Sequence, residues 1–82
     1  MKLYYIDNNL LLIVRYYDDG DLLAKESYNH NMKREGITIF YYGNEQLSSI
    51  SNYLNDFKNG LEQRYKLYDK KSILIINTFY IR

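Results

Sequence analysis

The sequence predicts a single α+β domain over residues 1–82, with one amphipathic helix packed on one face of a four- to five-stranded, mainly antiparallel sheet. Three observations predict this class. The chain has 82 residues, the length of one domain. Its apolar and β-branched residues form short runs separated by turn sequences, as strands do. One later stretch spaces its apolar residues three and four apart, which indicates a helix.

The predicted elements follow the order β-β-β-β-α-β. The expected strands are residues 3–6, 10–17, 22–28, 37–42 and 73–81. Between the second and third strands, residues 18–21 read Asp-Asp-Gly-Asp, which favours a tight hairpin because Gly and Asp tolerate positive φ. We expect no internal repeat.

The predicted helix begins at Asn44, whose side chain can accept a hydrogen bond from a first-turn amide, and continues to about residue 67. Gly60 is unfavourable inside a helix, so the helix ends at Asn59 in an alternative interpretation. The stripe that would face the sheet consists of Leu47, Ile50, Leu54, Phe57, Leu61, Tyr65 and Tyr68.

Composition limits the function. Eleven Lys and Arg stand against ten Asp and Glu, which argues against a dedicated duplex-DNA binder and against an acidic DNA mimic. The chain contains no cysteine, so disulfides and thiolate metal sites are excluded. No run approaches the ~18 apolar residues of a membrane span, and no signal-peptide pattern follows Met1. We therefore expect a cytoplasmic protein without membrane contact, cofactor or metal.

Eleven tyrosines include three Tyr-Tyr doublets within predicted strands. Adjacent strand residues point to opposite faces, so each doublet should place one ring in the core and one outside. Outward rings such as Tyr17 and Tyr42 are typical of protein interfaces. The alternative is that these rings simply cover the sheet, since tyrosine favours strands.

Acidic side chains gather near the first hairpin turn. Asp18, Asp19, Asp21 and Glu26 are candidate contacts for cations on a partner protein. The turn lacks the ligand spacing of a calcium loop, and a solvated turn is the alternative interpretation.

A second candidate surface is basic and aromatic. Arg64, Lys66, Lys70 and Lys71 alternate with tyrosines, as in single-strand nucleic-acid binders, although cations also favour a helix C-terminus. The only histidine, His30, lies in a predicted surface loop without catalytic partners. We therefore expect no enzyme activity and no catalytic residues.

Two stretches resemble small phage-encoded anti-CRISPR proteins that inhibit the type II-A effector nuclease. The first comprises residues 12–15, 19–20 and 26–27, and the second comprises residues 57–60 with Gln63 and Tyr65. The resemblance covers part of the chain and implies a hairpin followed by a helix. That family presents carboxylates to the nuclease, whereas the segment after residue 63 is basic here, so the acidic role would fall to the first hairpin.

The leading expectation is a phage or mobile-element protein that binds and inhibits a host defence protein, such as a CRISPR effector nuclease, in the cytoplasm of an infected host cell. Inhibition would be stoichiometric and would involve no catalysis. The alternatives are a small nucleic-acid-binding module that uses residues 64–71 and an oligomeric sponge for a nucleotide signal. The apolar last strand, from Ile73 to Ile81, is a candidate homodimer edge.

Overall fold

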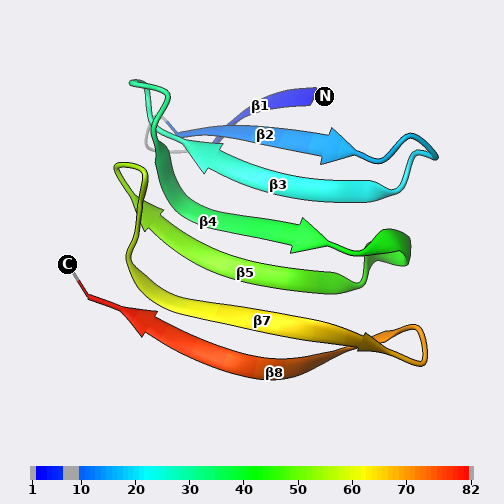
Figure 1. The fold of residues 1–82 in the computed structure, drawn as a ribbon. Helices are drawn as coiled ribbons and strands as arrows, with labels where there is room; N and C mark the ends of the chain where they lie inside the picture. Colours follow the sequence, from blue (N-terminus) through cyan, green and yellow to red (C-terminus); the bar gives the residue numbers. More distant parts are fainter. Residues whose placement is uncertain (1, 7–9, 82) are drawn as a thin grey trace.

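The computed structural model describes residues 2–6 and 10–81 and shows one curved antiparallel sheet (Figure 1). A short 3-10 helix, η1 (Gly43–Glu45), lies between the fourth and fifth strands. The strands are β1 (Lys2–Ile6), β2 (Leu10–Tyr16), β3 (Leu22–Tyr28), β4 (Arg34–Tyr41), β5 (Leu47–Leu54), β6 (Phe57–Lys58), β7 (Gly60–Tyr68) and β8 (Lys71–Tyr80). Their spatial order is β1-β2-β3-β4-β5-β7-β8, and β6 pairs with β5.

The predicted α+β class is wrong, because the expected helix over residues 44–67 is η1, β5, β6 and most of β7. Ile50 and Leu54 are four residues apart, and an even spacing also places two side chains on one face of a strand. Asn55 and Asp56 both adopt positive φ, 48° and 71°. They turn the chain back so that Phe57 pairs with Leu54. The apolar residues with helix-like spacing, such as Ile50, Leu54 and Phe57, therefore lie along a β-hairpin.

Most of the predicted strands and the first turn are confirmed. β2, β3 and β8 agree with residues 10–17, 22–28 and 73–81 to within two residues at each end. β4 begins at Arg34, three residues before the predicted start. The Tyr17 amide donates to the Asp21 carbonyl at 2.7 Å and closes the hairpin turn that the Asp-Asp-Gly-Asp sequence predicts.

A single sheet buries little apolar surface. The molecule measures 39 × 32 × 17 Å. Among residues 10–81, the buried apolar side chains are Ile13, Val14 and Ala24. Six buried side chains in the same range are polar, and four of them lie in one row across the sheet: Glu26, Thr38, Ser51 and Glu62. We call the side of the sheet that carries this row the polar face.

The strand register shows an internal repeat that the sequence analysis missed. The hairpins β2–β3, β4–β5 and β7–β8 follow one another at intervals of roughly 25 residues. Each pairs a first-strand residue with a second-strand residue at the same height in the sheet: Ile13 with Glu26, Thr38 with Ser51, and Glu62 with Thr78. Two residues after each second-strand member stands a tyrosine, namely Tyr28, Tyr53 and Tyr80. Glycines with φ of +88° and +84° precede Thr38 and Glu62 by two residues. The fold is therefore a short array of hairpins.

Candidate functional site

Four of the six predicted partner-binding residues surround one depression at the turn end of the hairpins. Its volume is about 590 Å³. The first hairpin supplies its turn, the second supplies the start of η1, and β7 supplies an apolar side chain. The lining residues are Tyr17, Asp18, Asp19, Tyr42, Gly43 and Leu67. We call this site the acidic depression.

Hydrogen bonds from two tyrosine hydroxyls to backbone carbonyls hold the acidic depression in place. The Tyr17 hydroxyl donates to the Tyr41 carbonyl at 2.6 Å, and the Tyr42 hydroxyl donates to the Tyr65 carbonyl at 2.7 Å. Each bond links two different hairpins, so both rings are fixed although Tyr17 is 38% exposed. The two tyrosines therefore connect neighbouring hairpins and also line the depression.

The three aspartates of the turn differ in the hydrogen bonds that their carboxylates accept. The Asp21 amide donates to Asp19 Oδ1 at 2.9 Å, and Asp21 Oδ2 accepts from the Asn44 amide at 3.0 Å. Asp21 thereby joins the first turn to η1 and does not line the depression. Asp18 is exposed, and within the described residues its carboxylate has no hydrogen bond or ion pair.

The acidic depression suits a cation with an apolar stem. Carboxylates form charge-assisted hydrogen bonds with guanidinium and ammonium groups, and tyrosine faces attract the same cations. Leu67 adds apolar surface for the methylene groups of a lysine or arginine. Within residues 10–81 no group of three or more His, Cys, Asp or Glu is arranged to hold a metal ion.

Glu26 lies outside the acidic depression, in the buried row of the polar face. It is 1% exposed and pairs with Arg15 Nε at 2.9 Å and with Arg34 Nη2 at 2.8 Å. The Tyr28 hydroxyl also donates to it at 3.2 Å. The structure thus gives Glu26 a place inside the fold, where it is not available to a partner.

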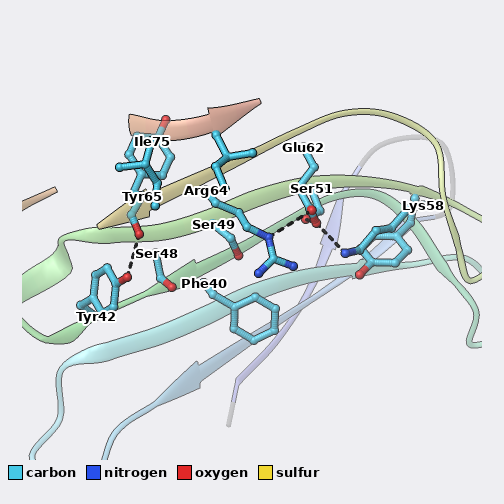
Figure 2. Close-up of a pocket in the computed structure, with 12 residues that line it drawn as sticks. Phe40, Tyr42, Ser48, Ser49, Ser51, Lys58, Glu62, Arg64, Tyr65 and Ile75 are labelled. Carbon is cyan, nitrogen blue, oxygen red and sulfur yellow. Dashed lines mark hydrogen bonds and ion pairs between the residues drawn. The ribbon is translucent and has the colours of Figure 1, made fainter. Parts of the chain in front are cut away.

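A second depression, of about 530 Å³, lies on the polar face over β4, β5, β7 and β8, and no motif of the sequence predicted it (Figure 2). At one side of it Glu62 is held by Lys58 Nζ at 2.6 Å, by the Ser51 hydroxyl at 2.7 Å and by Arg64 Nε at 3.3 Å. Burial raises the pKa of Glu62, but its hydrogen bonds with these three residues outweigh burial and lower the pKa to about 2. An alignment of the three hairpin sequences is the signal from which this cluster could have been predicted.

The predicted nucleic-acid residues do not form one free basic patch. Arg64 binds Glu62, and Lys66 Nζ lies 6.0 Å from the centre of the Tyr68 ring. Lys70 stands in the β7–β8 turn with a φ of 65°, and Lys71 begins β8. These four residues lie in β7, in the β7–β8 turn and at the start of β8, and not near the C-terminus of a helix as the sequence suggested. His30 is exposed in the β3–β4 loop.

No family model matches this sequence, and comparisons with curated proteins and with solved structures also find no match. Within residues 2–6 and 10–81, no helix is long and apolar enough to cross a membrane. The first stretch of the anti-CRISPR resemblance does form a strand, turn and strand. The second stretch forms β6 and β7 where the resemblance implies a helix, so the order of elements behind that resemblance is lost.

Proposed function

We propose that this protein is a stoichiometric binding module that docks a basic side chain of a partner protein in the acidic depression, with no chemistry of its own. The observation that supports the proposal is the grouping of Tyr17, Asp18, Asp19, Tyr42 and Leu67 around one hollow. These residues come from three hairpins that are far apart in sequence. Tyrosine is enriched among binding hot spots, and an unpaired carboxylate beside it attracts a cation on a partner.

The biological setting that we propose is inhibition of a host defence protein in the bacterial cytoplasm. It depends on the small size of the domain and on the first stretch of the resemblance, which keeps its strand, turn and strand. A CRISPR effector nuclease would suit the site chemically, because surfaces that bind nucleic acid are rich in exposed Arg and Lys. An inhibitor of such a surface needs carboxylates and rigid apolar contacts, and the acidic depression offers both.

Affinity capture with matched variants tests this proposal. The baits are the wild-type chain, Asp18→Asn and Asp56→Asn, each incubated with nuclease-treated bacterial lysate and analysed by mass spectrometry. Both substitutions remove one carboxylate at a hairpin turn, and Asn at position 56 can still accept the hydrogen bond from the Arg34 amide. The two turns lie at opposite ends of the strands.

The expected result is one protein captured in stoichiometric amount by wild type and by Asp56→Asn. Its titrated affinity for Asp18→Asn should be about tenfold weaker, which corresponds to about 1.4 kcal/mol for a charge-assisted contact. Equal affinity for Asp18→Asn and Asp56→Asn would remove the acidic depression from the interface. Capture that depends on intact nucleic acid would favour the basic residues of β7 and β8 instead.

A further inference from the structure

The outer edge of β8 has no partner strand within residues 2–6 and 10–81, and it forms one boundary of the sheet (Figure 1). Natural edge strands are usually protected by charges, by proline or by being short. β8 has ten residues, and none is charged between Ser72 and Tyr80. Its bulge lies near Ile75, so Ile76–Tyr80 is regular as well as uncharged.

The side chains of this edge are apolar and exposed. In β8 the exposed fractions are 49% for Ile73, 42% for Leu74, 54% for Ile75, 49% for Ile76 and 69% for Phe79. Because strand neighbours point to opposite faces, this exposure affects both sides of the sheet edge. A partner that extends the sheet would cover apolar surface on both sides at once.

The accessible surface is larger than a compact monomer requires. The chain exposes 5932 Å², whereas a folded monomer of 10.0 kDa is expected to expose about 5,200 Å². The surplus of roughly 700 Å² is close to the ~800 Å² per partner that a standard interface removes. One interface of ordinary size would therefore bring the exposed surface to the usual value.

The repeat shows that a strand edge in this position takes an antiparallel neighbour. β8 is the second strand of its hairpin, as β3 and β5 are of theirs. β3 pairs with β4, and β5 pairs with β7, so each earlier second strand has an antiparallel neighbour on its far side. The edge of β8 is equivalent to those edges and is left open.

We propose that β8 pairs antiparallel with β8 of a second copy, through Ile76–Tyr80, to form a two-fold symmetric dimer with one continuous sheet. Antiparallel pairing of two identical strands has two-fold symmetry, so the assembly closes at two chains. Because these strand segments carry no charge, two copies approach without repulsion between like charges. Pairing of β8 with β1 of another copy would be head-to-tail and would produce open chains of molecules.

Molar mass in solution tests the dimer. Multi-angle light scattering and sedimentation equilibrium should give about twice 10.0 kDa for the wild-type chain. Ile76→Lys places a charge within the proposed pairing segment and should give a monomer. The matched control Ile37→Lys changes an isoleucine on the interior strand β4 that is 50% exposed, against 49% for Ile76, and should remain a dimer. A monomeric wild type at the highest attainable concentration, a dimeric Ile76→Lys or a head-to-tail polymer would each overturn the proposal.

Disulfide trapping gives an answer even if Ile76→Lys fails to fold. The chain has no cysteine, so single-cysteine variants report one position each. In a two-fold antiparallel pair one residue faces its own copy, with Cβ atoms about 4.5–5.5 Å apart. Cysteines placed one at a time from Ile76 to Tyr80 should include one that cross-links much faster than Ile37→Cys. No cross-linking above that control would refute pairing through this segment.

Discussion

Removing the charge of Glu62 should destabilise the fold at neutral pH and have little effect in acid. Its pKa is about 2 in the folded protein against an ordinary 4.5. A carboxylate with a lowered folded pKa stabilises the protein above its unfolded pKa, and this contribution is lost as pH falls toward the folded pKa. A difference of about 2.5 pKa units corresponds to about 3 kcal/mol. Glu62→Gln imitates the protonated side chain and should lose that amount.

Urea unfolding at several pH values, followed by circular dichroism, measures the effect. The loss of stability in Glu62→Gln relative to wild type should be about 3 kcal/mol near pH 7, roughly 1.4 kcal/mol near pH 3 and under about 0.5 kcal/mol near pH 2. Glu45→Gln is the control, because Glu45 is an exposed glutamate in η1. Its effect should be small at every pH.

The shape of the pH dependence decides the interpretation. A loss for Glu62→Gln that is the same near pH 7 and near pH 3 would show that the charge is not stabilised by its partners. The loss would then come from altered packing beside Ser51, which donates to Glu62 at 2.7 Å. Lys58→Met should reproduce part of the loss, because Lys58 forms the shortest ion pair with this carboxylate, at 2.6 Å.

Three further substitutions test other parts of the sheet by urea unfolding. Lys70→Gly should stabilise the protein by about 1 kcal/mol, because Lys70 has a φ of 65° in a tight turn and glycine adopts this conformation without strain. Thr38→Val should stabilise by about 1 kcal/mol, since the buried Thr38 hydroxyl has no partner within the described residues; destabilisation would reveal one. Arg34→Met should cost about 3 kcal/mol by leaving the buried Glu26 short of a cation, and a cost below about 1 kcal/mol would contradict this.

The strands could be predicted from sequence because their signals are local. The Asp-Asp-Gly-Asp turn and the β-branched run before Tyr41 define hairpin boundaries by themselves. The segment 47–61 failed because its signal is ambiguous at short range. Apolar spacings of four suit either a helix or a strand, and only the Asn55-Asp56 turn distinguishes the two. An adjacent Asn-Asp pair is a weaker turn signal than Asn-Gly, so the sequence favours the helix.

The candidate site was partly predictable for a similar reason. Tyr17 and the aspartates that follow it are adjacent in sequence, so their common location is a local fact. Tyr42 and Leu67 lie beside them because three hairpins are neighbours in one sheet, and only the repeat predicts that arrangement. The repeat escaped detection because equivalent positions differ chemically: Ile13, Thr38 and Glu62 stand at one height of the sheet. The strand register shows that these positions are equivalent, whereas the types of residue at them do not.

The polar face explains how a one-layer sheet holds its shape, and it accounts for several of the tyrosines. Arg34 lies 5.3 Å from the centre of the Tyr53 ring, and Lys58 lies 5.3 Å from the centre of the Tyr80 ring. Each cation thus pairs with a buried glutamate and also lies over a tyrosine ring, which belongs to the same hairpin for Arg34 and to β8 for Lys58. Long cationic side chains bury their apolar stems and keep their charges in water, which is one way for a one-layer sheet to cover polar groups without a second layer. These tyrosines are structural, so a high tyrosine count alone does not indicate a binding face. Tyr17 and Tyr42 differ from them, because these two rings line a hollow beside the carboxylate of Asp18, which has no partner within the described residues.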